Sequence, residues 1–567
     1  MKKRIASIAL SLAMCLTLLP TAAYAEDVSE GGAFDGQSST VNGAAVVENG
    51  EGNTVPVEGK GTKDEPYQIG TADGFYAFAR WYNQTQHDGK IYAELTEDIN
   101  LNEGFTFTES GYTGDVKPRE WTPISSGAYF PTYSGEFDGN GHTISGLYIK
   151  EDNATVSTTG LFGYFKGYLH DVKIVNSYIF SKSYCTGAFA GIVEGTIEDC
   201  TADAVVYSDA NASGFFDGTG GIVGNLYNLT SKVLNCTFSG SVSSDKNPYV
   251  GGIVGDNLYG YVAGCTNYGK VTSSVSSKVA VGGIVGQNRI TYDSDETAEG
   301  ESSVIERCIN NGSISGTNSA GGIVSVSSLV EGSSSENKPY IGAIRNCLNT
   351  GSVNGSVAGG IIGYLEKSTN VDNCLNIGTV SGTPAGAIAG VQLSSCKIAD
   401  SYYQENESLN AVGQLGTNGN PIPDPNEQVF DATEDQISGG EISWNLNTNN
   451  GTQANSKIWA INAGKPTLAS DTVKPTYRVV FDFPEGTDDI IVYTSAAGTA
   501  EIPDAAQNMA LTYQNDNETK IFTGNTVVPA DMTVTVAEKQ ACTAPVFAKN
   551  TDTLTEENIG VQGVQTR

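Results

Sequence analysis

The sequence GGIVG at residues 220–224 is the first of several nearly identical segments that determine the fold of this chain. Its later copies are GGIVG at 251–255 and 282–286, GGIVS at 321–325, GGIIG at 359–363 and GAIAG at 386–390. Chance does not explain so many copies in one chain, so we interpret residues 220–390 as an array of repeated structural units.

A second repeated segment follows each of the first copies, with a cysteine at a fixed place in it. An aliphatic residue precedes the cysteine by three positions, and Asn, Gly and Val or Ile often follow it. The copies are VLNCTFSGSV at 233–242, VAGCTNYGKV at 262–271, IERCINNGSI at 305–314, IRNCLNTGSV at 344–353 and VDNCLNIGTV at 371–380, with diverged versions ending at Cys200 and Cys396.

The repeats predict a parallel β-helix. A period of roughly 20 to 40 residues is typical of solenoids, in which each unit buries its apolar face only by stacking on its neighbours. The repeated segments are rich in Val, Ile, Gly, Ser, Thr and Asn, which favours strands and turns. They lack the i, i+3, i+4 apolar spacing of helices, which makes a helical solenoid a poor alternative.

In a parallel β-helix, equivalent residues of successive coils lie about 4.8 Å apart and form columns. We expect one inward column of isoleucines, at positions 222, 253, 284, 323 and 361. A second column contains the repeat cysteines Cys200, Cys236, Cys265, Cys308, Cys347, Cys374 and Cys396. An odd number cannot pair completely, and no CxxC or Cys/His cluster suits zinc, so buried free thiols are expected rather than disulfides or a metal site. A ladder of hydrogen-bonded asparagines is expected two positions further on, at Asn267, Asn310, Asn349 and Asn376.

These two segments together, GGIVG followed by a phrase of the form NCxNxG, resemble the GLUG motif. This repeat is found in secreted and cell-surface bacterial proteins, including the amino-terminal regions of some immunoglobulin A peptidases. The resemblance extends over about residues 60–470. It implies a β-helical rod and does not imply one particular activity.

The rest of the chain divides around this array. Lys2, Lys3 and Arg4, a following apolar run and the small-residue site Ala23-Tyr24-Ala25 predict a secretory signal peptide with cleavage after Ala25. The expected parts are a signal peptide at 1–25, a flexible acidic leader at 26–60, an N-terminal cap with the first coils at 61–159, GLUG-type coils at 160–396, a C-terminal cap at 397–470, a small antiparallel β-domain at 471–540 and a polar tail at 541–567.

Local signals suggest how the array ends. A short helix is expected after Thr71 as its N-cap, and its apolar face would close the first coil. DGNG at 138–141 is read as a turn rather than a metal loop, because Asn-Gly between apolar runs is a turn signal. At the other end, Trp444 and Trp459 are expected to be buried over the last coil rather than to stack on sugars.

The formal net charge of −33 argues against nucleic acid and anionic lipid as direct partners. After signal cleavage no membrane insertion is expected. The sequence indicates no cofactor and no metal, and it predicts an extracellular glycan or protein as the ligand.

Two common hydrolase motifs are missing from the sequence. It contains neither HExxH nor GxSxG, so the zinc-peptidase site of some GLUG-bearing proteins is absent, and it has three histidines, His87, His142 and His170. Enzymes with a β-helix that cleave polysaccharides need clustered carboxylates on one wall. Between residues 220 and 390 the charged residues do not recur at one repeat position: Asp245, Asp256, Asp293, Asp295, Glu296, Asp372, Lys232, Arg289, Arg307 and Arg345.

Five tyrosines shortly after the glycine-rich segments are candidate ligand-stacking residues, although packing over loops is the simpler interpretation: Tyr227, Tyr259, Tyr261, Tyr292 and Tyr364. The sequence therefore predicts a secreted or cell-surface, non-catalytic, adhesion-type protein with a β-helical binding wall. The alternative is a polysaccharide-active enzyme similar to the pectin lyases.

Overall fold

The computed structural model describes residues 45–48, 54–84, 90–126, 132–153, 158–210, 217–275, 280–290, 301–329, 341–366, 368–393, 396–417, 424–448 and 457–538. The chain forms two compact units, residues 1–429 and 430–567. The predicted signal peptide, most of the acidic leader and the polar tail lie outside the described residues.

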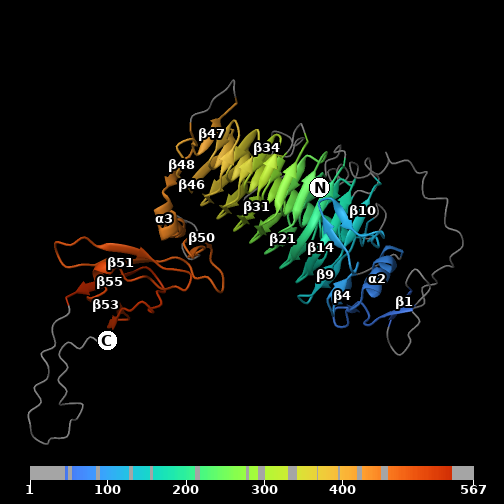
Figure 1. Cartoon of the computed structure of the whole chain (residues 1–567), viewed down its shortest axis with the longest axis horizontal. Helices are drawn as coiled ribbons and strands as arrows, with labels where there is room; N and C mark the ends of the chain where they lie inside the picture. The colour runs from blue at the N-terminus through green and yellow to red at the C-terminus, as the bar shows by residue number, and fades with distance from the viewer. Residues whose placement is uncertain are drawn as a thin grey trace, which may run out of the picture. The chain divides into compact units, whose positions relative to one another are not determined.

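The first unit is a parallel β-helix, as the repeats predicted. Its strands form three parallel sheets of 27, 9 and 8 strands, and Figure 1 shows the strands of successive coils lying side by side. The eight-stranded sheet contains β11 (Thr158–Thr159), β15 (Cys185–Thr186), β19 (Gly218–Gly220), β24 (Tyr249–Gly251), β29 (Ala280–Gly282), β34 (Ser319–Gly321), β39 (Val357–Gly359) and β44 (Ala385–Gly386). The nine-stranded sheet contains β12 (Phe162–Phe165), β16 (Ala190–Val193), β20 (Val223–Tyr227), β25 (Val254–Leu258), β30 (Val285–Ile290), β35 (Val324–Leu329), β40 (Ile362–Leu365), β45 (Ala389–Gln392) and β47 (Val412–Leu415).

The large sheet takes up to three short strands from each coil. Its members are β3 (Tyr67–Ile69), β4 (Ile91–Leu95), β5 (Ile99–Asn100), β8 (Gly135–Asp138), β9 (Thr143–Ser145), β10 (Tyr148–Glu151), β13 (Tyr168–His170), β14 (Lys173–Ser181), β17 (Thr196–Glu198), β18 (Thr201–Ser208), β21 (Lys232–Leu234), β22 (Thr237–Phe238), β23 (Ser241–Ser244), β26 (Tyr261–Ala263), β27 (Thr266–Asn267), β28 (Lys270–Ser273), β31 (Glu301–Glu306), β32 (Ile309–Asn310), β33 (Ile314–Gly316), β36 (Ile341–Arg345), β37 (Leu348–Asn349), β38 (Val353–Asn354), β41 (Thr369–Asp372), β42 (Leu375–Asn376), β43 (Val380–Ser381), β46 (Lys397–Gln404) and β48 (Glu427–Ala432).

The glycine-rich segments form the turn between the two smaller sheets, and they are in register from coil to coil. Gly220 pairs with Gly251, and Gly251 pairs with Gly282. The expected isoleucine column is confirmed, because each member is 0% exposed and belongs to one continuous core: Ile222, Ile253, Ile284, Ile323 and Ile361.

The double glycine is explained by close backbone approach. A Cβ on Gly251 would lie 1.9 Å from the carbonyl oxygen of Val254, and a Cβ on Gly252 would lie 2.1 Å from the carbonyl oxygen of Gly283. No side chain fits at these spacings, so the segment requires glycine at both positions.

The expected asparagine ladder is also confirmed. The Nδ2 of Asn267 donates to Oδ1 of Asn310 at 2.8 Å, Asn310 donates in the same way to Asn349 at 2.7 Å, and Asn349 donates to Asn376 at 2.7 Å. Each Nδ2 also donates to the carbonyl two residues further along the chain, as in Asn310 to Gly312 at 3.2 Å. The buried amides are thereby satisfied, and each fixes its coil against the next.

The repeat cysteines are buried and free, which agrees with the expectation of unpaired thiols. Burial raises the pKa of the inner thiols well above the ordinary value, as at Cys308. Cys185, which lies outside the predicted cysteine column, is a further buried cysteine, in the eight-stranded sheet.

One member of the predicted cysteine column is wrong. Cys396 precedes β46, whereas Ser401 occupies the column position after Cys374: its Oγ donates to the carbonyl oxygen two residues earlier and accepts from the N–H of Cys374 at 3.2 Å. The segment IADSYY at 398–403 is therefore the last copy of the repeat, with serine in place of cysteine.

The N-terminal cap is built as expected. Helix α2 (Ala72–Gln84) begins after Thr71, whose Oγ1 accepts a hydrogen bond from the N–H of Gly74 at 3.1 Å. Its buried face includes Phe75 and Tyr82, and the Phe75 ring lies 4.6 Å from that of Trp121. The helix thereby covers apolar surface at the open end of the β-helix (Figure 1).

The DGNG segment follows its prediction, whereas the acidic leader does not. The DGNG segment is a turn, with Asn140 at φ 50° and its N–H donating to Oδ1 of Asp138 at 2.7 Å. The leader, expected to lack structure throughout, contains an antiparallel hairpin of β1 (Ala45–Glu48) and β2 (Thr54–Val57), since valine-rich segments favour strands.

The second unit is a small β-domain with two short helices. A five-stranded sheet in the order β52-β51-β55-β53-β54 consists of β51 (Arg478–Asp482), β52 (Ile490–Tyr493), β53 (Ala510–Asn515), β54 (Glu518–Ile521) and β55 (Met532–Ala537). Three of its pairings are antiparallel, as expected, whereas β51 and β55 pair in parallel.

Residues 430–470 belong to this second unit, which differs from their expected place in a cap at 397–470. Helices α3 (Glu434–Gly439) and α4 (Glu441–Thr448) precede the hairpin of β49 (Trp459–Asn462) and β50 (Lys465–Leu468). Asn447 of α4 donates to the carbonyl oxygens of Trp459 and Thr476, which ties the segment to the domain that follows it.

Trp444 and Trp459, which were expected over the last coil, both lie in the second unit. Trp459 is 0% exposed within the second unit. Trp444 is half-buried there, and its Nε1 donates to Asp531 at 3.0 Å. Among the described residues, no helix has the length and apolarity needed to cross a membrane.

Candidate ligand-binding face

Aromatic rings gather on the outer face of the large sheet, in its early coils. Alternation along β14 directs Ile179 into the core and leaves Tyr178 and Phe180 half-buried on the other face. Tyr148 of the preceding coil stacks on Tyr178 with ring centroids 6.1 Å apart. Phe107, from the hairpin of β6 (Thr106–Thr108) and β7 (Gly111–Thr113), stacks on Tyr148 at 5.7 Å.

Tyr207 continues this aromatic face into the next coil. Its ring lies 5.5 Å from that of Phe180, and its hydroxyl donates to Oδ2 of Asp245 at 2.7 Å. Ser274 donates to the other oxygen of the same carboxylate at 2.6 Å, and these two hydrogen bonds lower the pKa of Asp245. We call Tyr178, Phe180 and Tyr207 the aromatic face.

Charged side chains border the aromatic face at the ends of the same strands. The Nζ atoms of Lys150 and Lys182 each lie 3.5 Å from a carboxylate oxygen of Asp152. Lys246 pairs with Asp209 at 2.9 Å. The pairs are at least partly exposed, so their stabilising energy is small and they remain able to exchange partners.

Of the five tyrosines singled out in the sequence, the four that the structure describes do not form one surface. Tyr227 and Tyr259 are neighbours through a β-bridge, while Tyr364 lies on the nine-stranded sheet several coils further along. Tyr261 lies on the large sheet, and Tyr292 is outside the described residues. Their role in ligand stacking stays a prediction.

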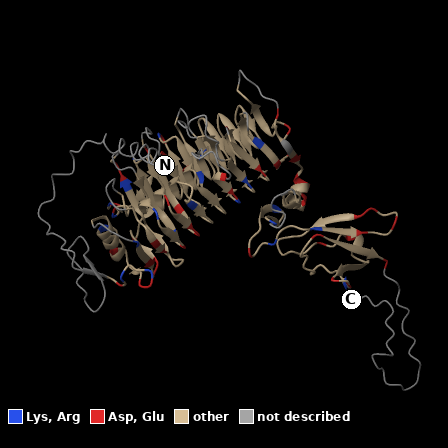
Figure 2. Cartoon of the chain, turned by 180° about the vertical axis from the view of Figure 1, so that it is seen from behind, with Lys and Arg blue, Asp and Glu red and all other residues tan. Residues whose placement is uncertain are grey.

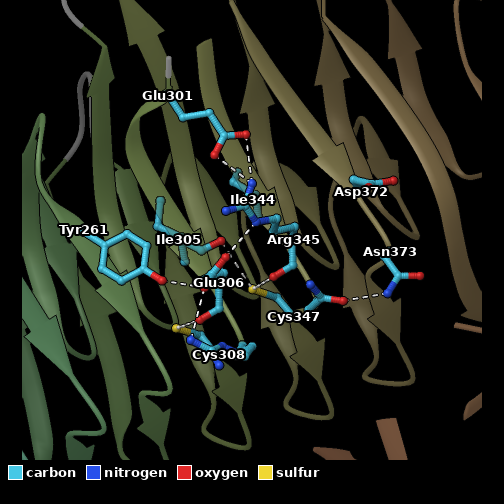
Figure 3. Close-up of polar contacts among 12 residues, drawn as sticks. Tyr261, Glu301, Ile305, Glu306, Cys308, Ile344, Arg345, Cys347, Asp372 and Asn373 are labelled. Carbon is cyan, nitrogen blue, oxygen red and sulfur yellow. Dashed lines mark hydrogen bonds and ion pairs between the residues drawn. The ribbon is translucent and has the colours of Figure 1, made fainter. Parts of the chain in front are cut away.

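Tyr261 instead belongs to a network of ion pairs across three coils, shown in Figure 3. Its hydroxyl donates to Oε1 of Glu306, and Nε of Arg345 donates to Oε2 of the same carboxylate at 2.6 Å. Nη1 of Arg345 also reaches both oxygens of Glu301, at 2.8 and 2.7 Å. Both oxygens of Glu306 are thus occupied, which indicates that the network joins coils rather than performs chemistry.

The expectation that the charged residues of the array are unaligned is wrong at this place. Glu306, Arg345 and Asp372 occupy one column in register. Their charges alternate, so neighbouring coils attract. Burial, followed by the charge of Asp400, raises the pKa of Asp372.

A second pair is deeply buried. Nε of Arg289 donates to Oδ1 of Asp256 at 2.9 Å, and Asn225 donates to Oδ2 of the same residue at 2.9 Å. Asp256 is 0% exposed, and burial raises its pKa despite the guanidinium beside it. Aspartate and arginine are therefore fully engaged with each other, in keeping with a structural role.

Carboxylates and a histidine converge on the outer face of the first coils. His170 lies at the end of β13, in register with Asp138 of β8. Its Nδ1 lies 2.8 Å from Oδ2 of Asp171, and its Nε2 lies 3.3 Å from Oε1 of Glu136. Although burial opposes the charged form, hydrogen bonding to Asp171 and the charge of Asp138 raise the pKa of His170. Of the other histidines, His142 lies 3.3 Å from Asp98 and His87 is outside the described residues.

Neither the aromatic face nor the histidine cluster was predicted from the sequence. The outward positions of NSYIFS at 176–181 and AVVYS at 204–208 carry the aromatic residues, and period-two alternation gives a usable signal for them. No comparable signal joins Asp138 to His170, because only the register of two coils brings them together.

The fold places this chain in the class of all-β proteins. It consists of a parallel β-helix and a separate small β-domain. No family model matches the chain, so its resemblance to the GLUG repeat stays a prediction. Halomucin from Haloquadratum walsbyi is 28% identical over an alignment of 263 residues that covers 41% of this chain. The match spans only 3% of the length of halomucin.

Among solved structures, the crystal structure of a candidate immunoglobulin A1 protease from Bacteroides ovatus is similar to this chain. The two are 18% identical with a TM-score of 0.38, and the match covers 72% of this chain and 94% of the other.

Proposed function

We propose that this chain is an extracellular, non-catalytic β-helical protein of the cell surface, and that it binds carbohydrate through the aromatic face. The predicted signal peptide supports an extracellular location. The partial likeness to halomucin supports the same location.

The proposal rests on one observation: the partly exposed rings of the aromatic face lie next to charged side chains. Aromatic rings offer flat apolar area with little conformational entropy to lose, which suits the apolar faces of sugar rings. Asp209 and Lys246 stand beside them and can exchange hydrogen bonds with sugar hydroxyls. The β-helix holds the rings on neighbouring strands, so the surface is preorganised.

The test is a glycan array on the full chain, followed by titration of the best ligand by calorimetry. Tyr178→Ala and Phe180→Ala should each weaken binding at least tenfold. Tyr268→Ala is the matched control, because Tyr268 is 59% exposed and lies on another part of the β-helix. Equal loss in the control, or no saturable binding of any glycan, would refute the proposal.

Substitution of Tyr227 and Tyr364 in the same assay tests the tyrosines predicted from the sequence. Loss of binding there, with Tyr178→Ala unaffected, would move the binding surface to the nine-stranded sheet.

A second function, cleavage of polysaccharide, is favoured by the carboxylates around His170. Glycoside cleavage needs two carboxyl groups facing one bond, and Glu136, Asp138 and Asp171 all lie near this imidazole. Release of reducing ends with turnover, abolished by Asp138→Asn, would establish this activity. Saturable binding without release of sugar ends would support the non-catalytic proposal.

A further inference from the structure

The cluster around His170 has the composition of a transition-metal site. The ligand atoms of Asp138, His170 and Asp171 all lie within 4.8 Å of one another. Nδ1 of His170 is 2.8 Å from Oδ2 of Asp171 and 3.6 Å from Oδ1 of Asp138. An ion held at about 2.0–2.2 Å from each of three ligand atoms fits between atoms spaced in this way.

The other nitrogen of the imidazole is occupied from outside this group. Nε2 of His170 lies 3.3 Å from Oε1 of Glu136. With Nε2 donating to this carboxylate, Nδ1 would give up the proton that it shares with Asp171 when an ion binds, and its lone pair would then face the ion. This carboxylate–histidine arrangement is the usual support of a metal-binding imidazole.

Ring and backbone contacts hold His170 and Asp138 in place. The ring of Tyr168 stacks on His170 at 4.4 Å, and the Tyr168 hydroxyl is held by Glu198 at 2.8 Å. Asp138 accepts from the N–H of Asn140.

The neighbouring coils are also tied together at this point. The N–H of Gly139 donates to the carbonyl oxygen of His170 at 2.8 Å, and the N–H of Gly141 donates to that of Asp171 at 2.9 Å. The site is therefore held by two stacked coils and needs little rearrangement to accept an ion.

We propose that Asp138, His170 and Asp171 bind one divalent transition ion of the zinc type, with Glu136 as the positioning residue of the imidazole. A nitrogen ligand favours such an ion over calcium or magnesium, which prefer oxygen ligands. The His170 side chain is 12% exposed and that of Asp171 is 51% exposed, so one side of the ion faces solvent and can carry water or a ligand. The proposal is independent of sugar binding at the aromatic face.

The experiment titrates the full chain with cobalt(II) chloride and zinc chloride. We expect one ion per chain, visible absorption bands of cobalt in a low-symmetry site, and displacement of cobalt by zinc. His170→Gln and Asp138→Asn should each weaken zinc binding at least tenfold, and Glu136→Gln should weaken it by about 10- to 100-fold. The matched control is His142→Gln, which removes a histidine that also lies beside a carboxylate and should leave binding unchanged.

Three results would overturn the proposal. One is the absence of stoichiometric zinc uptake by the unmodified chain, which is decisive even if a variant fails to fold. Another is unchanged zinc affinity in both His170→Gln and Asp138→Asn. The last is preference for calcium over zinc, which would assign the carboxylates to an oxygen-only site.

Discussion

Replacement of Asn310 is the sharpest test of the asparagine ladder. This side chain is 0% exposed and takes part in four hydrogen bonds. It accepts from Asn267 at 2.8 Å and from the N–H of Gly312 at 3.2 Å, and it donates to Asn349 at 2.7 Å and to the carbonyl of Gly312 at 3.2 Å. Each hydrogen bond contributes about 1 kcal/mol net, so Asn310→Ala should lower the free energy of unfolding by about 3–5 kcal/mol.

Asn310→Asp separates hydrogen bonding from packing. Aspartate has nearly the same shape, but its oxygen would face Oδ1 of Asn349 without a proton between them, and its charge would be buried. Burial raises the pKa of such a carboxyl. The folded state then favours the protonated form, whose O–H can donate to Asn349, so the loss of stability in this variant should shrink as the pH falls.

Urea unfolding of the full chain, followed by circular dichroism of the β-helix, measures both variants. Asn311→Ala is the neighbouring control, because Asn311 is exposed and the hydrogen bond that its side chain accepts from Thr350, at 2.7 Å, lies at the surface. The reasoning fails if Asn310→Ala costs less than about 1 kcal/mol. It also fails if the control is equally destabilised, or if the Asp variant does not recover at low pH.

Three further predictions concern the same coils. Gly322→Ala should destabilise the β-helix by about 3 kcal/mol or more, since its Cβ would lie 2.0 Å from the carbonyl oxygen of Gly360; an unchanged urea midpoint would contradict this. Arg307→Asn should raise stability by about 1 kcal/mol, because Arg307 has φ 53° at a turn position that Asn346 occupies one coil later, and a lower midpoint would contradict it. Burial raises the pKa of thiols such as Cys308 above the unfolded value of 9.0, so their stabilisation is complete below pH 9 and is lost at higher pH, at about 1.4 kcal/mol per thiol per pH unit. A urea midpoint that does not change between pH 8 and pH 10 would refute the last prediction.

The repeats made the interior of the β-helix predictable from the sequence. Ile253 and Asn310 recur at constant positions within their segments, and a parallel β-helix places equivalent positions one above another. A residue type that recurs in the repeated segments therefore recurs at the same place in successive coils. Cys396 shows the limit of this reasoning. Its residue type suggested a place in the cysteine column, whereas the surrounding repeat pattern gives that place to Ser401.

Features without repetition were not predictable in this way. The buried row in which Asn257 donates to Asn288 at 2.8 Å and Asn288 donates to Ser327 at 3.4 Å changes residue type from coil to coil. The division of the chain at residue 430 depends on tertiary contacts of α4, which local sequence does not reveal.

The charge distribution was likewise only partly predictable. Composition gives the net negative charge, whereas Figure 2 shows that acidic and basic residues are interspersed along the β-helix. The alternation of Glu306 and Arg345 in one column depends on strand pairing between residues 39 positions apart.

The direction of the asparagine ladder has a consequence for how such a chain can change its length. Every amide donates toward the C-terminal neighbour, so each coil offers the same acceptor to the coil before it and the same donor to the coil after it. Excision of the stretch from Asn310 to Leu348 would set Asn267 opposite Asn349. The same hydrogen bond between two asparagine side chains would then form across the new junction. Duplication of a coil would be equally tolerated. The β-helix can therefore become longer or shorter by whole coils without substitutions in its core.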